Sequence, residues 1–318
     1  MWGMRLLVLG GTGFVGRHIV ECALARGDEV TLFNRGRSAP GLFPQAELLR
    51  GDRRGDLRAL AEGGTWDAAI DVTGYRPEQV AGSSQLLAER VEWLTFISTI
   101  SVYDDVSRPR VDESAALAAL DGAGGWRDYG ALKVLCEAEV HAALPGRALI
   151  VRPGIVAGPH DPTNRFSWWV ARCARGGRVL APAPPESPLQ LIDARDLAAF
   201  VVDTTAARAA ETFNAVGEDL SWEQMLAACC ALAPGATPAW VSEAVLLAAG
   251  IDDEQLPLWI APSDRENAGL MRIDGTRAVE AGLRHRPIEQ TARDTYAALR
   301  PEDGPGLDPA LEARLIAA

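Results

Sequence analysis

Long apolar runs are missing from this sequence of 318 residues, although 48% of it is hydrophobic. No run approaches the roughly 18 apolar residues of a membrane-spanning helix, and the apolar stretch at residues 4–9 lacks a cleavage-site pattern. We therefore expect a soluble, cytoplasmic protein without membrane partners. A chain of this length has room for one large or two modest domains, each with a core.

The sequence also has few cysteines and histidines, and its net charge is negative. The five cysteines are odd in number and never spaced as CxxC, which is typical of reduced cysteines in a core. The four histidines are scattered, so we expect no metal site. A formal net charge of -12 disfavours nucleic acid as a partner, although a local basic patch stays open. A small-molecule substrate is the expected partner, and a homodimer is left open.

The start of the chain does contain a strong motif. An apolar stretch at residues 5–9 precedes Gly10, Gly13 and Gly16, and a helical pattern follows. Gly10 permits a tight turn, Gly13 lets the backbone approach a pyrophosphate, and Gly16 lets the helix pack close to the strand. The helix N-terminus would then face the phosphates. This pattern predicts a dinucleotide site. Its expected contact residues are Gly10, Thr12, Gly13, Phe14, Val15 and Gly16.

Strands and helices alternate through the first half of the chain. We expect strands over residues 5–9, 29–33, 47–50, 67–72, 91–98 and 148–152, with helices over 56–61 and 77–90. This alternation predicts an α/β fold, a doubly wound parallel-sheet Rossmann domain with a smaller C-terminal substrate lobe. The expected division is a cofactor domain at 1–157, the lobe at 158–300 and a tail at 301–318. The chain returns to the first domain around 189–210, and residues 311–316 have a helical pattern.

The end of the second strand bears on cofactor choice. Asn34 stands where dinucleotide sites usually place an acidic residue on the ribose hydroxyls, and Arg35 and Arg37 follow. The site lacks a carboxylate that would repel a 2′-phosphate and has guanidinium groups to bind it. NADP(H) is therefore favoured over NAD(H), the alternative being two solvated arginines. Asp52 either accepts a hydrogen bond from the adenine amine or belongs to a turn.

A tyrosine and the only lysine of the chain lie four residues apart, at Tyr129 and Lys133. A helical pattern continues through residue 140, so both share one helix face. A phenol titrates near ~10, and an adjacent ammonium would lower this pKa toward a range useful for acid–base catalysis. Lys133 can also donate to the nicotinamide ribose hydroxyls. A solvated lysine next to a packing tyrosine is the alternative.

The fifth expected strand ends in three hydroxyl-bearing residues, Ser98, Thr99 and Ser101. Ligands bind at such strand ends in parallel sheets. Thr99 is the first choice for a hydroxyl that holds the substrate oxygen beside Tyr129. Ser98 and Ser101 compete for this role, and any of the three could instead satisfy backbone groups at the strand end.

Together these motifs resemble the extended short-chain dehydrogenase/reductases, also described as the NAD-dependent epimerase/dehydratase family. Residues 10–16 are similar to its cofactor turn, Tyr129 and Lys133 match its YxxxK, and Thr99 precedes Tyr103 by four residues as its catalytic Ser/Thr does. The resemblance implies a catalytic role for Thr99, Tyr129 and Lys133. It covers nearly the whole chain, with residues 152–159 similar to the segment that lines the nicotinamide and 191–197 to its return to the core domain. The further cofactor contacts implied are Thr73, Gly74, Ser98, Pro153, Gly154 and Ile155.

Two departures point to an atypical branch. Residues 102–104 read VYD where many members read VYG, and residues 72–75 read VTGY where they carry an apolar-Ala-Ala turn. Most nucleotide-sugar epimerases of the family retain an acid after the second strand, whereas the Asn34–Arg35 pair is similar to NADP-using reductases. This favours an NADP(H)-dependent carbonyl/alcohol oxidoreductase over an NAD-dependent nucleotide-sugar epimerase or dehydratase. A non-catalytic cofactor sensor or RNA-binding protein is the third reading.

Aromatic side chains are concentrated near the expected substrate lobe. They could line a pocket between the lobes, or they could form the core of the second lobe, since aromatic clusters mostly serve packing. The substrate contacts we expect are Tyr75, Ser101, Trp126, Arg165 and Trp168.

Overall fold

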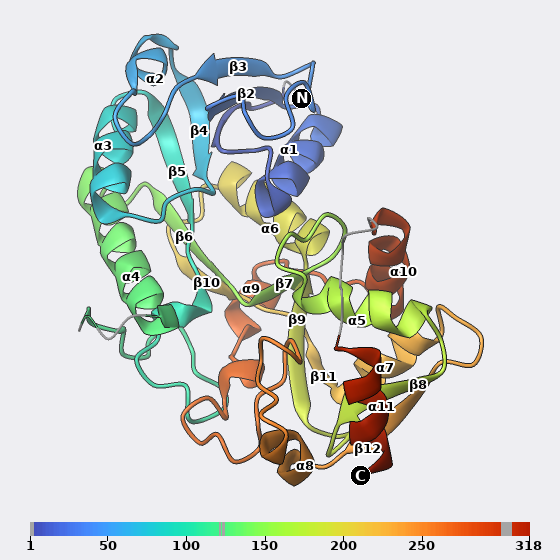
Figure 1. Cartoon of the computed structure of the whole chain (residues 1–318). Coiled ribbons are helices and arrows are strands. Elements are labelled where there is room, and N and C mark those ends of the chain that lie inside the picture. The colour runs from blue at the N-terminus through green and yellow to red at the C-terminus, as the bar shows by residue number, and fades with distance from the viewer. Residues whose placement is uncertain (1–2, 121, 123–124, 300–306) are drawn as a thin grey trace.

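The computed structural model describes residues 3–120, 122, 125–299 and 307–318, without the side chains of residues 125–127. A seven-stranded parallel sheet organises the first domain (Figure 1). Its strands, in spatial order, are β10 (Thr212–Ala215), β6 (Ala148–Pro153), β5 (Val91–Ile97), β4 (Trp66–Asp71), β1 (Arg5–Leu9), β2 (Glu29–Asn34) and β3 (Glu47–Arg50). The strand order reverses between β1 and β4, so the sheet is doubly wound and a ligand crevice is expected beside β1. The predicted α/β class is confirmed.

Helices cover both faces of this sheet, as Figure 1 shows. One face carries α1 (Phe14–Arg26) and α6 (Ala194–Ala206), and the other carries α2 (Arg58–Glu62), α3 (Pro77–Leu87) and α4 (Gly125–Ala143). In α1, Ile19, Val20 and Ala23 recur at helical spacing and are fully buried against the sheet. Gly27 then ends α1 in the left-handed conformation, with a φ of 89° that glycine adopts without strain.

Two expected helices differ at their ends. Helix α2 begins at Arg58 because Asp56 lies in a turn, where its carboxylate accepts a hydrogen bond from the Arg58 N–H. Helix α3 ends at Leu87 because the chain turns there, with the Arg90 N–H donating to the Leu87 carbonyl.

The second lobe consists of two small sheets and their helices. Strands β7 (Ile155–Ala157), β9 (Pro188–Asp193) and β11 (Asp219–Ser221) form one sheet, and β8 (Arg178–Pro182) pairs with β12 (Thr237–Val241) in the other. The lobe also holds α5 (Arg165–Ala174), α7 (Trp222–Cys230), α8 (Glu243–Ala248), α10 (Ile288–Ala298) and α11 (Pro309–Ala317). The short helices η1 (Ile100–Val102), η2 (Leu270–Arg272) and α9 (Thr276–Glu280) complete the chain.

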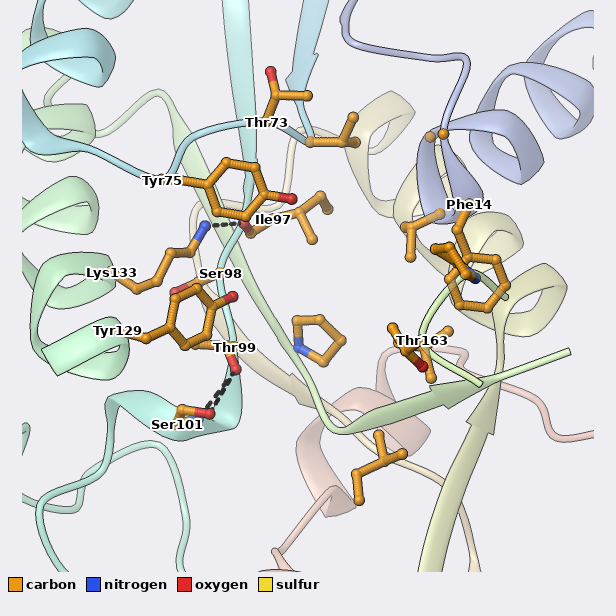
Figure 2. A pocket seen from close by; sticks show the side chains of 18 of the residues that line it. Phe14, Thr73, Tyr75, Ile97, Ser98, Thr99, Ser101, Tyr129, Lys133 and Thr163 are labelled. Carbon is orange, nitrogen blue, oxygen red and sulfur yellow. Dashed lines mark hydrogen bonds between the residues drawn. The ribbon is translucent and has the colours of Figure 1, made fainter. Parts of the chain in front are cut away.

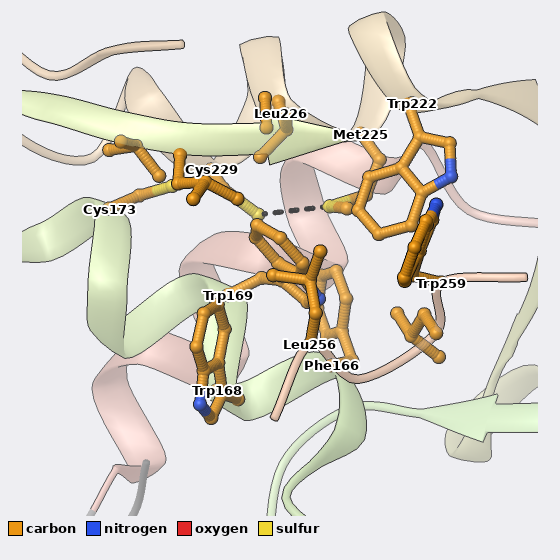
Figure 3. Close-up of a cluster of buried hydrophobic side chains, with 14 of the residues drawn as sticks. Phe166, Trp168, Trp169, Cys173, Trp222, Met225, Leu226, Cys229, Leu256 and Trp259 are labelled. Carbon is orange, nitrogen blue, oxygen red and sulfur yellow. Dashed lines mark hydrogen bonds between the residues drawn. The ribbon is translucent and has the colours of Figure 1, made fainter. Parts of the chain in front are cut away.

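Tryptophan side chains fill the core of this lobe (Figure 3). The Trp169 ring packs edge-on against Trp168 and Trp222, with ring centroids 4.6 and 4.9 Å apart. Its indole N–H donates to the Pro257 carbonyl at 2.7 Å, which satisfies the polar end of a fully buried ring. This hydrogen bond fixes the segment before Trp259.

The chain returns to the first domain through more than the expected segment 189–210. Helix α6 packs beside α1, and β10, just beyond that segment, pairs with β6 at the edge of the large sheet. Ala278 of α9 and Leu283 also join the first domain's core.

The described part of the expected tail, residues 307–318, is docked. Glu312 of α11 accepts from the Arg172 Nε at 2.8 Å and from the Leu180 N–H at 3.0 Å, and Leu315 is buried. A buried ion pair in such a network resists separation, since either partner alone would be an uncompensated charge. Residues 301–306 of the expected tail lie outside the described residues.

None of the helices that the structure describes is both long and apolar enough to cross a membrane. All five cysteines are free thiols, and four of them are buried.

Candidate functional site

A cavity of about 1230 Å³ lies at the carboxyl ends of the large sheet's strands and reaches the second lobe. Its walls come from the loops after β1 to β6 and from residues 247–271 of the lobe. Figure 2 shows Tyr129, Thr99 and Lys133 on one side and Phe14 on the other. The expected site residues that line it are Gly10, Thr12, Gly13, Phe14, Val15, Gly16, Asn34, Arg35, Arg37, Asp52, Thr73, Tyr75, Ser98, Thr99, Ser101, Tyr129, Lys133, Pro153, Gly154, Ile155 and Arg165.

The glycine turn presents backbone to this cavity. Gly10 has a φ of 110°, which a side chain would strain, and a Cβ at Gly16 would come within 2.9 Å of the Gly11 nitrogen. A Cβ at Gly13 would meet no atom within 4 Å, so this residue faces open space. Gly13 is also the N-cap of α1 and has no side-chain cap, which leaves the first N–H groups of the helix for an anion.

The loop after β2 is ordered by Asn34 itself. Its side-chain NH₂ donates to the Gly10 carbonyl at 3.0 Å, and its oxygen accepts from the Gly36 N–H at 2.7 Å. Arg35 and Arg37 are exposed and form no ion pair with a residue that the structure describes. Their guanidinium groups are therefore free for a ligand at this end of the cavity.

Asp52 and its neighbour Arg53 follow β3. One carboxylate oxygen of Asp52 accepts from the Arg54 N–H at 3.0 Å, so the residue orders a turn while lining the cavity. Arg53 makes a bidentate ion pair with Asp71 at 2.7 and 2.8 Å and donates to the Thr73 hydroxyl at 3.0 Å. The pair joins the loop after β3 to the end of β4, and Arg53 lines the cavity.

Sequence reasoning missed this ion pair. Burial acts to raise the pKa of Asp71, but the charge and hydrogen bonds of Arg53, together with the Thr73 N–H and the charge of Lys133, outweigh it. The pKa is lowered, so the carboxylate stays ionised. The available signal was Asp71 itself, a charged residue at the end of an apolar strand, which needs a partner when buried.

The hydroxyls after β5 have separate partners. Ser98 donates to Glu137 at 2.5 Å, and this carboxylate also pairs with Arg152 at 2.7 Å. The Thr99 hydroxyl accepts from the Ser101 N–H and donates to the Ser101 hydroxyl, each at 3.1 Å. Thr99 therefore caps η1, and it also forms a hydrogen bond with Tyr129. Of the three hydroxyls, Thr99 is the one tied to the phenol.

Tyr129 is 37% exposed and faces the cavity from α4 (Figure 2). Burial raises the pKa of Tyr129 above its usual value, and nearby Tyr75 adds to the rise, while the hydrogen bond with Thr99 and the charge of Arg165 oppose it. The phenol is thus held in its protonated form at neutral pH.

The ammonium of Lys133 is hydrogen-bonded to backbone carbonyls. It donates to the Gly74 carbonyl at 2.8 Å and the Ile97 carbonyl at 2.6 Å, and it lies 4.1 Å from the Phe96 ring centroid. Burial lowers its pKa to about 8, although Asp71 opposes this. This corrects the expectation that Lys133 lowers the pKa of Tyr129, because a carbonyl after β4 and one at the end of β5 hold the ammonium and the pKa of the phenol is raised.

The remaining expected residues divide between cavity and core. Gly74 contributes only its carbonyl to Lys133 and does not line the cavity. Tyr75 is 55% exposed at the cavity wall, and its ring centroid is 5.7 Å from the Lys133 ammonium. Trp168 is 5% exposed and packs on Trp169, so the structure places it in the lobe core. The side chain of Trp126 lies outside the described residues.

The wall opposite the strand ends was also missed. It is formed by apolar side chains between residues 247 and 271, which we call the lobe wall: Leu247, Ile251, Leu258, Trp259, Leu270 and Met271. This stretch contains no local motif, and only the fold of the second lobe brings it to the cavity.

The fold is of the Rossmann type, a doubly wound parallel sheet with a cavity at the carboxyl ends of its strands. The sequence profile described as NAD dependent epimerase/dehydratase family matches residues 6–215. The chain belongs to this family.

Individual relatives are more distant. The chain is 30% identical over 178 residues, 50% of its length and 54% of the relative's, to a dTDP-6-deoxy-L-talose 4-dehydrogenase (NAD(P)(+)) of Kitasatospora kifunensis. It is 28% identical to the chloroplast stem-loop binding protein of 41 kDa b of Arabidopsis thaliana, over 73% of this chain and 63% of that protein. It is also 28% identical to a 2-alkyl-3-oxoalkanoate reductase of Stenotrophomonas maltophilia, over 55% and 57%. The chain thus spans between half and two thirds of these relatives' lengths.

Solved structures confirm the fold. The Bordetella bronchiseptica enzyme WbmH, solved in complex with NAD⁺, superposes with a TM-score of 0.67 over 94% of this chain and 99% of that chain, at 16% identity.

Proposed function

We propose that this chain is an NADP(H)-dependent oxidoreductase that interconverts a carbonyl and an alcohol on a small organic substrate. The observation that carries the proposal is that one cavity joins the N-terminus of α1, the free arginines after β2 and the hydrogen-bonded Thr99–Tyr129 pair. These are an anion site, a 2′-phosphate site and a proton donor, arranged along one cleft.

The residues present fit a nicotinamide dinucleotide. Open space at Gly13 and the uncapped start of α1 suit a pyrophosphate. Arg35 and Arg37 would hold the 2′-phosphate. The Lys133 ammonium has three N–H donors and uses two of them for backbone carbonyls, so it would donate the third to a ribose hydroxyl. The bound cofactor would supply or accept the hydride.

A protonated Tyr129 can donate the proton that carbonyl reduction requires. A phenol with a raised pKa is a proton donor at neutral pH, as a carbonyl oxygen requires when hydride reaches its carbon. The Thr99 hydroxyl lies beside this phenol and would hold the same oxygen through a hydrogen bond. The relative named as a 2-alkyl-3-oxoalkanoate reductase also supports carbonyl reduction.

Net cofactor turnover tests this function. The purified protein would be given NADPH and a panel of metabolite carbonyls and nucleotide sugars, with absorbance and product mass as readouts. We expect stoichiometric loss of NADPH and a product heavier by one hydride and one proton. A product isomeric with its substrate, formed with catalytic amounts of retained NAD, would replace the reductase by an epimerase.

RNA binding is the alternative function, and one relative is named a chloroplast stem-loop binding protein. The net charge of -12 weighs against it, since phosphate contacts need cations. Titration of labelled RNA at several salt concentrations tests this alternative, because phosphate contacts make the binding constant fall steeply with salt.

A further inference from the structure

The side chains of the lobe wall are held in place by the packing of the second lobe. Trp259 and Leu258 are 5% and 6% exposed, and the hydrogen bond from Trp169 to the Pro257 carbonyl anchors the segment before them. Leu258 has a φ of 74°, a left-handed conformation that strains a leucine and persists only where packing imposes it. The packing of the lobe thus holds these side chains against the cavity.

Leu247 extends this surface toward solvent. It lies on α8 and is 49% exposed, so a large apolar side chain stands at the cavity with half of its area uncovered. A ligand gains free energy from burying this apolar area when it covers the area with a hydrocarbon surface.

Charges at this end of the cavity are mainly negative. Of the charged second-lobe residues that line the cavity, Asp252, Asp253 and Asp264 are acidic, and Arg165 is the one cation among the described residues. The remaining cavity arginines follow β2 and β3, at the adenosine end of the proposed cofactor site. A nucleoside diphosphate is normally gripped by several arginines or lysines, and carboxylates repel it.

We infer that the lobe wall selects an uncharged carbonyl compound whose hydrocarbon chain lies along it, and that this end of the cavity rejects nucleoside-diphosphate sugars. The inference rests on the proposed function, because it takes Tyr129 to mark the reacting end of the substrate. It adds a substrate class that charge and apolar surface define.

A homologous series measures this selection. Straight-chain methyl ketones from butanone to dodecanone would be reduced with NADPH, and the protein with NADP⁺ would be titrated with the same ketones and with UDP-glucose by calorimetry. We expect kcat/KM and affinity to rise about three- to fourfold per methylene until the wall is covered. UDP-glucose should bind more weakly than dodecanone.

Leu247 offers a variant that spares the core. Leu247→Ser should lower kcat/KM for dodecanone about tenfold and leave that for butanone unchanged, since only the long chain covers this side chain. Leu135→Ser is the matched control, because Leu135 is a helical leucine of similar exposure, 43%, away from the cavity. It should change neither value.

These measurements distinguish failure of the inferred substrate class from failure of the proposed reductase function. Ketones that bind in order of chain length without consuming NADPH would uphold the substrate class and overturn the reductase. Reduction or binding that ignores chain length, no binding by any ketone, or tighter binding of UDP-glucose would overturn the inference.

Discussion

Replacing Lys133 by methionine should alter stability in a pH-dependent way. The lysine side chain is 2% exposed, and its ammonium is held by the carbonyls of Gly74 and Ile97. Methionine keeps an unbranched chain in the same space and removes the charge. The pair of proteins therefore isolates the cost of burying this ammonium.

The magnitude follows from the pKa of Lys133, which burial lowers from 10.5 to about 8. Between these pH values the unfolded chain holds a proton that the folded protein has released, so wild-type stability rises with pH across the window. The shift corresponds to about 3 kcal/mol. Below pH 8 the full penalty of the buried ammonium is present.

Urea unfolding of both proteins, followed by tryptophan fluorescence, measures this difference. The free energy of unfolding of wild type minus that of Lys133→Met should rise by about 3 kcal/mol from below pH 8 to pH 10.5, at equal m values. Leaving the Gly74 and Ile97 carbonyls without their donor costs about 1–3 kcal/mol each, equally at every pH. The neighbouring thiol of Cys136, with a pKa raised from 9.0 to about 11, titrates inside the window only in the unfolded chain, and this contribution is common to both proteins. A difference in unfolding free energy that does not change with pH would show that burial does not lower the pKa of Lys133.

Three further substitutions probe the proton donor, the cofactor end and the core. Tyr129→Phe should lower turnover ~10²- to 10⁴-fold at unchanged NADPH affinity, and a variant that keeps most activity would rule out Tyr129 as the proton donor. Arg35→Ala should weaken NADPH but not NADH in fluorescence titrations, and unchanged NADPH affinity would make the arginine a surface group. Glu137→Leu should destabilise by about 3–5 kcal/mol in urea unfolding, because Arg152 is left as a buried unpaired charge, and adding Arg152→Met should recover part of that loss. A double variant no more stable than Glu137→Leu alone would show that the unpaired Arg152 charge is not the source of the loss.

Local pattern was enough to predict the parts of the site that depend on neighbours in sequence. The turn at Gly10, Gly13 and Gly16 depends on backbone freedom and on the strand and helix beside it. Tyr129 and Lys133 share a helix because the helical pattern around them is continuous. The alternation of strands and helices likewise predicted the parallel sheet and the edge at which the cavity lies.

Tertiary structure decided which atoms these side chains meet. Lys133 lies beside carbonyls that follow β4 and end β5, so the predicted effect on Tyr129 was replaced by a raised pKa. Arg53, in the loop after β3, pairs with Asp71 at the end of β4, and Trp168 packs into the lobe core instead of the cavity. The lobe wall lines the same cavity as Tyr129 from more than a hundred residues away in sequence. Burial, ion pairs and cavity walls join distant segments, and only the folded chain fixes their distances.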